Sequence, residues 1–358
     1  MKKKILISTG GSGGHVIPAV AFYEHLKKNY EVFLTLDRRG IKFINQKKYE
    51  FEIMRAPRLT LNVIKLPLTF LNLFISIFKC IFFLKKKKID ILIGTGGYMS
   101  VPICIAAKIL NLKIYLFEPN MVIGRANKFL LKFCTKLFCY SDEIINFPKK
   151  YKNKMVMINH ILRKELYNFD KYTKVKIEDK IKILVVGGSQ GAKIFDEEIK
   201  KSILDLSKKY NLMIYHQASS FDFNNLEFFY KEHNIENKLF NFEENIFHFI
   251  KEANLAITRA GASTLSELAF LKVPFIAIPY KFATDDHQFE NALNYERQGY
   301  CWILKEKEFN QHKLTSLLIN IIENKDDYLS KKNNLENFCY QNTWNNINEK
   351  VINSLNEN

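Results

Sequence analysis

The feature that most constrains this chain is a short apolar run that ends in a cluster of glycines, because it occurs once in each half. Residues 4–7 run into the loop 10–15 (GGSGGH), and residues 180–186 run into the loop 187–191 (GGSQG). Apolar residues with helical spacing follow each loop. A strand, a glycine loop and a helix in succession are typical of a parallel sheet covered by helices, so the sequence predicts an α/β protein.

A weaker copy of the pattern completes each half, since residues 90–97 are similar to residues 254–261. The length of 358 residues suits two domains. We expect domains at residues 1–165 and 166–335, with a C-terminal helix at 336–358 that packs back on the first domain. Two such domains facing one another leave a cleft lined by loops at the strand carboxyl ends, where α/β sheets bind ligands.

Composition excludes several classes of protein. The formal net charge is +17, from 54 Lys and Arg residues against 37 Asp and Glu residues, but no basic–aromatic RNA motif occurs, so we expect no nucleic-acid partner. An apolar content of 47% excludes a disordered chain. The six cysteines form no CxxC pair and give no support to a zinc site. The apolar run near the start is too short for a signal peptide, so we expect a cytoplasmic protein.

The most apolar stretch, residues 66–84, is followed at once by four lysines. A helix of this length spans about 28 Å, so a transmembrane helix is one interpretation, and a helix buried in the domain is another. We favour a third, in which the helix lies in the plane of an anionic membrane surface. The residues expected to touch the membrane are Phe70, Phe74, Phe78, Lys79, Phe82, Lys85, Lys86, Lys87 and Lys88.

The first glycine loop matches neither of two common phosphate-binding motifs. The pattern GxGxxG starting at Gly11 needs a glycine where Val16 stands, and GxxxxGK[ST] is absent. The physical argument holds without a motif, because glycines let backbone N–H groups approach a phosphate and a helix N-terminus favours negative charge. A tight turn that packs helix on strand is the alternative for any one loop.

Residues 259–267 (RAGASTLSE) combine small residues with hydroxyls at an expected helix start. Glu267 is placed to accept hydrogen bonds from the hydroxyls of a ribose. A capping box formed by Ser263 with Ser266 or Glu267 is the alternative. Polar side chains suited to sugar hydroxyls follow the next apolar strand, at Asp285, Asp286, His287, Gln288 and Asn291.

Five motifs stand in the order seen in one family of glycosyltransferases. They are GGSGGH at 10–15 with Pro18, GTGGYMSVP at 94–102, EPN at 118–120, GGSQGA at 187–192 and RAGASTLSE at 259–267. On these motifs the chain resembles, from its first strand to residue 300, the MurG family of undecaprenyl-pyrophosphoryl-MurNAc-pentapeptide N-acetylglucosaminyltransferases. The resemblance implies a GT-B fold, in which two Rossmann-like parallel-sheet domains face a cleft.

The family transfers GlcNAc from UDP-GlcNAc to the C4 hydroxyl of MurNAc in lipid I, which gives lipid II for peptidoglycan synthesis. The resemblance therefore implies a role in cell-wall biogenesis, cell shape and cell division. It places the protein as a peripheral protein at the cytoplasmic face of the bacterial inner membrane. The implied partners are UDP-GlcNAc, lipid I, the anionic membrane surface and a cell-wall synthesis complex. The first domain would bind the acceptor and the membrane, and the second would bind UDP-GlcNAc.

The family inverts the anomeric centre, and such a single displacement needs a base for the acceptor hydroxyl. His15 matches the family histidine in that role; binding of diphosphate or capping of the helix is the alternative. The residues that match donor contacts are Ser12, Gly13, Gly14, Asn120, Arg163, Gly188, Ser189, Gln190, Glu243, Ala262, Ser263, Thr264, Leu265, Ser266, Glu267 and Gln288. The matching acceptor-diphosphate loop comprises Gly96, Gly97, Tyr98 and Ser100. No cofactor is implied, and the lack of an Asp-x-Asp pair gives no support to a metal site.

The chain departs from the family pattern at three places. Residues 158–163 (INHILR) stand where Gly-Asn-Pro-Val-Arg is usual. Without the proline, the local turn and the direction of the Arg163 side chain stay open. Pro119 and Glu243 stand where Gln and an apolar residue are common. None of these changes touches His15, so we expect an active enzyme. Two alternatives stay open, a related GT-B transferase acting on another membrane lipid and a non-catalytic membrane-associated scaffold.

Overall fold

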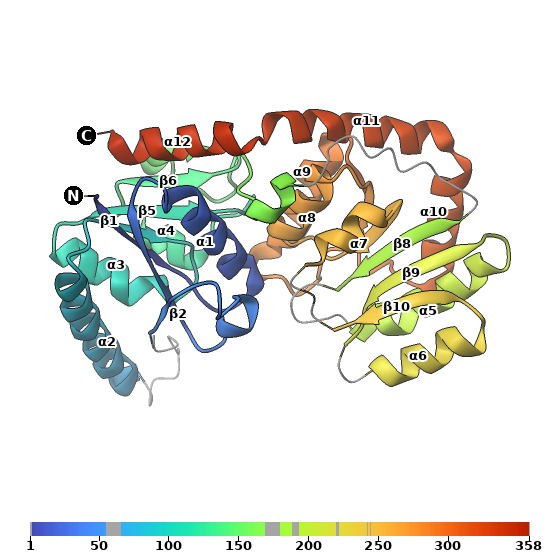
Figure 1. Cartoon of the computed structure of the whole chain (residues 1–358), viewed down its shortest axis with the longest axis horizontal. Helices are drawn as coiled ribbons and strands as arrows, with labels where there is room; N and C mark the ends of the chain where they lie inside the picture. Colours follow the sequence, from blue (N-terminus) through green and yellow to red (C-terminus); the bar gives the residue numbers. More distant parts are fainter. Residues whose placement is uncertain are drawn as a thin grey trace. The chain divides into compact units, whose positions relative to one another are not determined.

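The chain folds into two compact units, each with its own parallel sheet (Figure 1). The computed structural model describes residues 2–54, 66–168, 180–187, 193–219, 222–241, 243 and 245–357. The first unit comprises Met1–Lys164 with Trp344–Asn358, and the second comprises Glu165–Thr343. The predicted parallel α/β architecture is confirmed in both units.

In the first unit, seven parallel strands among the described residues form one sheet. Their order is β3 (Glu52–Ile53), β2 (Glu31–Leu36), β1 (Lys4–Ser8), β4 (Ile91–Gly94), β5 (Lys113–Glu118), β6 (Lys136–Cys139) and β7 (Met155–Met157). The order reverses between β1 and β4, which is the switch point where α/β sheets bind ligands. Ile5, Leu6 and Ile7 are completely buried because helices cover both faces, which explains why β1 reads as an unbroken apolar run.

The helices of the first unit pack on this sheet through aromatic and aliphatic side chains. They are α1 (Gly13–Leu26), α2 (Leu66–Lys87), α3 (Ser100–Ile109), α4 (Arg125–Leu130) and α12 (Trp344–Asn356), with the 3-10 helices η1 (Ile41–Phe43) and η2 (Lys149–Lys154). Phe22 of α1 meets Phe117 of β5 edge-to-face, with ring centroids 5.1 Å apart. This contact packs α1 against the sheet.

The second unit repeats the plan with six parallel strands among its described residues. Their order is β10 (Glu236–Phe240), β9 (Leu212–Gln217), β8 (Ile181–Val186), β11 (Leu255–Thr258), β12 (Phe275–Ala277) and β13 (Cys301–Ile303). The helices are α5 (Lys193–Ser207), α6 (Phe223–Glu232), α7 (Phe247–Glu252), α8 (Ala262–Phe270), α9 (His287–Arg297), α10 (Gln311–Glu323) and α11 (Lys325–Gln341). Two 3-10 helices complete the description, η3 (Lys164–Asn168) and η4 (Thr284–Asp286). The switch point here lies between β8 and β11.

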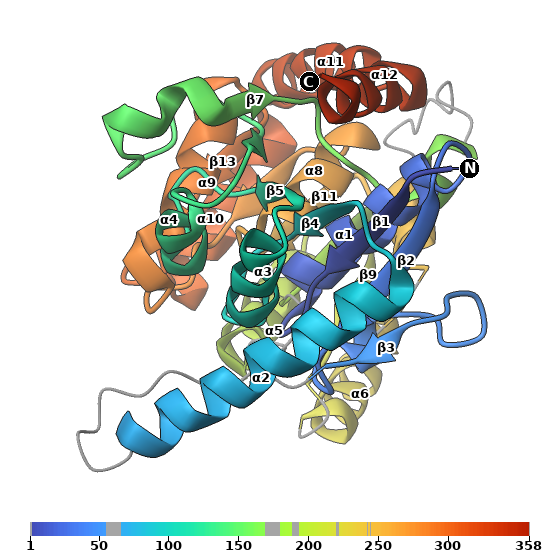
Figure 2. The same ribbon diagram turned by 90° about the vertical axis from the view of Figure 1, so that its left-hand side faces the viewer.

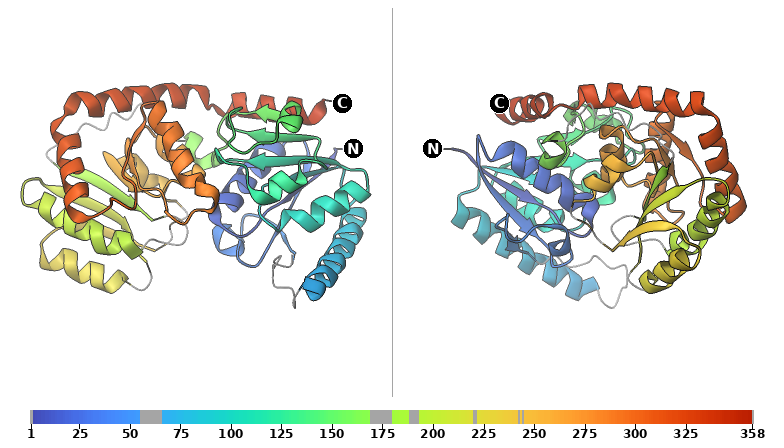
Figure 3. Two further views of the ribbon diagram at one scale, coloured as in Figure 1. Left: turned by 180° about the vertical axis from the view of Figure 1, so that it is seen from behind. Right: turned by 45° about the vertical axis from the view of Figure 1, so that its right-hand side comes forward.

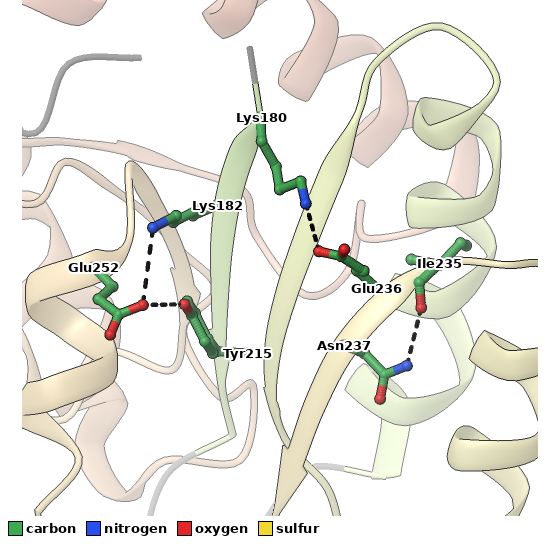
Figure 4. Close-up of polar contacts among 7 residues, drawn as sticks. All are labelled: Lys180, Lys182, Tyr215, Ile235, Glu236, Asn237 and Glu252. Carbon is green, nitrogen blue, oxygen red and sulfur yellow. Dashed lines mark hydrogen bonds and ion pairs between the residues drawn. The ribbon is translucent and has the colours of Figure 1, made fainter. Parts of the chain in front are cut away.

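Polar contacts tie α7 and β10 to the start of β8 (Figure 4). Lys182 Nζ lies 3.9 Å from Glu252 Oε2 at the end of α7, and the Tyr215 hydroxyl donates to the same carboxylate oxygen. Lys180 pairs with Glu236 at 2.6 Å. Both ion pairs are exposed, so each contributes little to stability.

The C-terminal helix α12 belongs to the first unit, where it lies along α1 (Figure 3). Trp344 stacks on His25 of α1 with ring centroids 3.6 Å apart, and the Tyr115 hydroxyl donates to the Ser354 carbonyl at 3.0 Å. The C-terminal segment that packs on the first unit begins at Trp344 and not, as expected, at residue 336. Residues 336–341 continue α11, in which Phe338 packs edge-to-face on Tyr300 of the second unit.

Helix α2 packs along α3 (Figure 2). Its other side exposes aromatic residues. Phe70, Phe74, Phe78 and Phe82 are between 51% and 71% exposed. The opposite side of α2 is buried, and Thr69, Cys80 and Leu84 lie on it. The buried-helix alternative is wrong, since only 22% of the apolar window within Pro67–Lys87 is buried. By length and composition alone this segment is able to cross a membrane.

Candidate active site

The carboxyl edge of the first sheet brings the first two glycine loops together. Ser8, the last residue of β1, pairs with Gly94, the last residue of β4, so both strands end at the same level. The loop after β1 leads into α1, and the loop after β4 leads into α3. The two loops that the sequence singled out therefore lie side by side at the switch point of this sheet.

His15 stands in the first turn of α1 and directs its ring toward the loop after β4. Its Nδ1 lies 2.8 Å from the carbonyl oxygen of Thr95, and the Thr95 hydroxyl donates to the Thr9 hydroxyl at 2.7 Å. A carbonyl oxygen only accepts, so Nδ1 carries the proton and Nε2 carries the lone pair in the neutral ring. The half-buried imidazole is therefore held in the tautomer that a general base at Nε2 requires.

Gly96 and Gly97 let the second loop pass close to this imidazole. Both have a positive φ, +94° and +74°. A Cβ on Gly96 would lie 3.2 Å from Cε1 of His15, so a side chain there would press on the ring. The Ser100 hydroxyl donates to the Gly96 carbonyl at 2.9 Å and ties the loop to the first turn of α3. Tyr98 belongs to the same loop.

The start of α1 presents backbone donors. Ser12 is the N-cap residue in an extended conformation, and its side chain makes no capping hydrogen bond. Gly13 and Gly14 form the first turn, and Gly14 is exposed. The N–H groups at the start of a helix and its dipole both favour an anion, so this turn is suited to a phosphate.

A third loop at the same edge is organised by a buried carboxylate. Glu118 ends β5, and its Oε1 accepts hydrogen bonds from the backbone and side-chain nitrogens of Asn120, at 3.2 and 3.0 Å. Its Oε2 accepts from Gly124 N at 2.8 Å and from Asn127 Nδ2 at 2.9 Å. The expected site residue Asn120 is thereby fixed beside the end of β5.

Arg163 lies half-buried between β7 and η3. The segment before it lacks the usual proline, yet it is anchored by the backbone N–H of Ile161, which donates to the Tyr140 hydroxyl at 3.1 Å. His160 packs its ring on Tyr140, with centroids 4.0 Å apart. These two contacts hold the segment in front of Arg163 against Tyr140.

In the second unit, Val186 of β8 pairs with Thr258 of β11, so these strands also end level. The loop after β8 was expected to hold the donor diphosphate, but Gly188, Ser189 and Gln190 lie outside the described residues. The helix that follows this loop is well anchored. Asp196, in the first turn of α5, lies 3.3 Å from His216 Nε2 and accepts from Ser219 N at 3.1 Å.

The loop after β11 places the start of α8 at the same edge. Gly261 is the N-cap residue and no side chain caps the helix, so the capping-box alternative is wrong. The Ser266 hydroxyl donates instead to the Ala262 carbonyl at 2.8 Å. Ser263 Oγ is buried without a hydrogen-bond partner among the described residues, and Glu267 is buried. An uncapped helix start with a hydroxyl still to be satisfied is suited to a polar ligand. The expected residues Thr264 and Leu265 lie in the same first turn.

The loop after β12 carries the expected sugar-binding side chains. Gln288, at the start of α9, accepts a hydrogen bond from Tyr280 N at 3.0 Å through its Oε1. Asp285 and Asp286 adopt left-handed conformations, with φ of 54° and 55°. Such strained pairs occur where a loop presents polar groups to a ligand. Glu243 follows β10, and its carboxylate accepts from Asn245 N at 2.9 Å.

Sequence reasoning assigned no role to four acidic or basic residues that organise the loops, although one of them, Glu118, stands in the EPN motif. Asp37 directly follows the apolar strand β2, Glu118 is the last residue of β5, and Arg39 comes two residues after Asp37. Asp196 is the fourth. The signal available was an acidic residue just after an apolar run or in the first turn of a helix. Among the described residues, no group of three or more His, Cys, Asp or Glu side chains is placed to hold a metal ion.

Comparison with known proteins gives matches along the whole chain. Models for the N-terminal and C-terminal domains of glycosyltransferase family 28 match residues 5–139 and 182–344. The chain is 51% identical over 358 residues, all of both chains, to the UDP-N-acetylglucosamine--N-acetylmuramyl-(pentapeptide) pyrophosphoryl-undecaprenol N-acetylglucosamine transferase of Pelagibacter ubique. It is 36% identical over 327 residues to the protein of the same name from Rickettsia canadensis, covering 90% of this chain and 91% of that one.

Solved structures support the same fold. The crystal structure of Acinetobacter baumannii MurG has a TM-score of 0.77 at 22% identity and covers 99% of each chain. A UDP-GlcNAc 2-epimerase from Neisseria meningitidis has a TM-score of 0.67 at 13% identity and covers 99% of this chain. The fold is that of a GT-B glycosyltransferase. Within that class, the chain belongs to glycosyltransferase family 28, among the N-acetylglucosamine transferases named above.

Proposed function

We propose that the chain transfers GlcNAc from UDP-GlcNAc to the C4 hydroxyl of MurNAc in lipid I, which gives lipid II for peptidoglycan synthesis. The observation that carries this proposal is the 51% identity along the entire chain to a curated transferase of that name. The geometry around His15 is consistent with it. No described feature favours another lipid acceptor or a scaffold without catalysis.

The chemistry is a single displacement that inverts the anomeric carbon. His15 Nε2 takes the proton of the C4 hydroxyl as its oxygen attacks the anomeric carbon of GlcNAc, and UDP leaves with the bonding electron pair. The Thr95 carbonyl holds the opposite ring nitrogen at 2.8 Å and stabilises the imidazolium as it forms. Backbone N–H groups and the dipole at a helix start stabilise the charge that develops on UDP.

The donor is proposed to bind the second unit. Ser263 is assigned to a polar group of UDP at the start of α8, and the support is that its buried Oγ lacks a partner among the described residues. Glu267, one turn later, is assigned to the ribose hydroxyls and Gln288 to the sugar. Ser189 and the loop around it are assigned to the diphosphate on the sequence motif alone.

The acceptor is proposed to bind the first unit while its lipid tail stays in the membrane. The outer side of α2 carries four exposed phenylalanines, and Lys79, Lys85, Lys86 and Lys88 are exposed along the same helix or just after it. Such a surface suits an interfacial helix that meets anionic headgroups. We place the protein as a peripheral protein at the cytoplasmic face of the bacterial inner membrane.

Purified protein incubated with labelled UDP-GlcNAc and a short-chain lipid I analogue tests the reaction. We expect label in a disaccharide product that carries an inverted, β-configured linkage, together with release of UDP. A diacylglycerol acceptor assayed in parallel should stay unlabelled. Transfer to diacylglycerol but not to the lipid I analogue, or no transfer and no binding of UDP-GlcNAc, would contradict the proposal.

A further inference from the structure

The loop after β2 carries an ion pair that reaches the first glycine loop. Asp37 is buried, and its Oδ1 accepts hydrogen bonds from Gly11 N at 2.8 Å and from Gly40 N at 2.9 Å. Its Oδ2 receives Arg39 Nε at 2.8 Å and lies 2.7 Å from Arg39 Nη2. The carboxylate thus binds the loop of Gly11 and the guanidinium of Arg39 at the same time.

Electrostatics keep this carboxylate charged. Burial alone would raise the pKa of Asp37, but the hydrogen bonds from Gly11, Arg39 and Gly40 and the charge of Arg39 outweigh it and hold the pKa below its usual value. Because Nε and Nη2 of Arg39 both contact the single oxygen Oδ2, the ion pair also fixes the plane of the guanidinium. Arg39 therefore has a defined position that does not depend on a ligand.

The other side of Arg39 faces the second glycine loop. Its guanidinium carbon lies 5.0 Å from the centre of the Tyr98 ring, and a Cβ on Gly11 would lie 3.5 Å from its Nη2. The side chain is 41% exposed although its charged end is held at both sides. A fixed, accessible guanidinium thus lies next to the loops of Gly11 and Tyr98, near the start of α1.

A guanidinium in this setting is suited to phosphate oxygens. Its donors match the spacing of two phosphate oxygens, and stacking on an aromatic ring leaves the edge of the guanidinium for polar contacts. The glycine loops supply backbone N–H groups beside it. Two diphosphates take part in the reaction, one in UDP-GlcNAc and one in lipid I. Arg39 stacks on Tyr98, which belongs to the loop assigned to the acceptor, and the donor is assigned to the second unit.

We propose that Arg39, positioned by Asp37 and Tyr98, contacts the diphosphate of the lipid acceptor and contributes to selecting acceptors that carry it. This inference rests on the proposed function, since it takes lipid I as the acceptor. Arg39 is a binding residue that leaves the proton transfer to His15. Asp37 is a positioning residue, because it acts through Arg39 and the Gly11 backbone.

Calorimetric binding of two soluble acceptor analogues, measured without donor, tests the proposal. One analogue carries the diphosphate of lipid I and the other carries a single phosphate. For Arg39→Ala we expect affinity for the diphosphate analogue to fall about 10- to 100-fold, and affinity for the monophosphate analogue to fall much less. Arg39→Lys, which keeps the charge and loses the fork, should lie between Arg39→Ala and the wild type.

The neighbouring Arg38 provides a matched control, because it is exposed and carries the same charge. Arg38→Ala should bind both analogues like the wild type, and all variants should bind UDP-GlcNAc like the wild type. Two results would overturn the proposal. If Arg39→Ala instead lost affinity for UDP-GlcNAc, Arg39 would be a residue that binds the donor. An equal loss of affinity for both analogues, together with a lower melting temperature, would show that Arg39 only holds the two loops together and does not bind the diphosphate. Absence of turnover in the wild type would contradict the proposed function and leave this comparison of affinities intact.

Discussion

At the scale of single residues, the proposed chemistry depends on which nitrogen of His15 is basic. The Thr95 carbonyl settles the tautomer through Nδ1. For His15→Ala we expect kcat to fall about 10²- to 10⁴-fold, the range typical for the loss of a general base. Initial rates at saturating UDP-GlcNAc and lipid I analogue measure this.

Two comparisons separate catalysis from folding and binding in this experiment. Affinity for UDP-GlcNAc, measured by calorimetry, should change little in His15→Ala, because the imidazole is assigned to the acceptor hydroxyl. The exposed His312 on α10 offers a control, and His312→Ala should keep the wild-type rate. Unchanged turnover in His15→Ala would remove the histidine from the role of base.

The glycine loops were predictable from sequence, whereas the side chains that hold them were not. The pair Gly96 and Gly97 predicts a tight loop, because the positive φ angles that such a loop needs depend on the residue type at each position. Glu118 accepts a hydrogen bond from Gly124 N, which is only six residues away, but Asp37 accepts one from Gly11 N, which is 26 residues earlier in the chain. A single acidic residue after an apolar strand does not reveal such a partner.

At the scale of secondary-structure elements, α2 is the helix proposed to meet the membrane. Lys85 and Lys86 are exposed at its end, whereas Lys87 lies 3.4 Å from Glu52. Each lysine near an anionic surface contributes about 1 kcal/mol at low salt. We therefore expect Lys85→Gln with Lys86→Gln to weaken binding to phosphatidylglycerol-containing vesicles about 30-fold, as measured by co-sedimentation.

A double variant elsewhere in the first unit controls for the loss of net charge. Lys149 and Lys150 are exposed in η2, and changing both to Gln removes the same charge. This control should bind vesicles nearly as the wild type does. Equal weakening in both double variants would show that only overall charge matters, and binding insensitive to salt would contradict a headgroup contact.

The break between α11 and α12 shows where element prediction failed. Residues from Lys325 to Asn356 are helical and largely polar on both sides of the break, so composition does not mark the change of unit. The break itself is short, at Asn342 and Thr343, and Asn342 is buried with its side chain donating to the Phe338 carbonyl at 2.7 Å. Only the packing partners, Tyr300 for Phe338 and His25 for Trp344, distinguish the two helices.

At the scale of the whole molecule, each unit contains one of the two tryptophans. Trp344 reports on the first unit through its stack on His25, and Trp302 reports on the second, where its Nε1 donates to Asp327 at 2.8 Å. Trp302→Phe therefore leaves a fluorescence signal from the first unit alone, and Trp344→Phe leaves one from the second. The stability of each unit is thereby measurable in the full chain.

The first unit should lose stability in mild acid because of His25. Burial lowers the pKa of His25 from 6.5 to about 3, and neither ring nitrogen has a hydrogen-bond partner among the described residues. The unfolded chain therefore takes up the proton first, so the stabilisation is complete above about pH 6.5 and is lost as the pH falls. Between about pH 6.5 and pH 5 this costs up to about 2 kcal/mol.

Urea unfolding of the Trp302→Phe protein, followed by Trp344 fluorescence at several pH values, measures this loss. His25→Phe keeps a ring on Trp344 and removes the proton-binding group. When this change is added to the Trp302→Phe protein, the free energy of unfolding should depend less on pH in this range. Carboxylates elsewhere in the unit titrate in both proteins, so the difference between the two curves isolates His25. The Trp302 signal in Trp344→Phe should not respond to His25→Phe, since His25 lies in the first unit. Parallel pH curves with and without His25 would show that its burial does not set the acid stability of this unit.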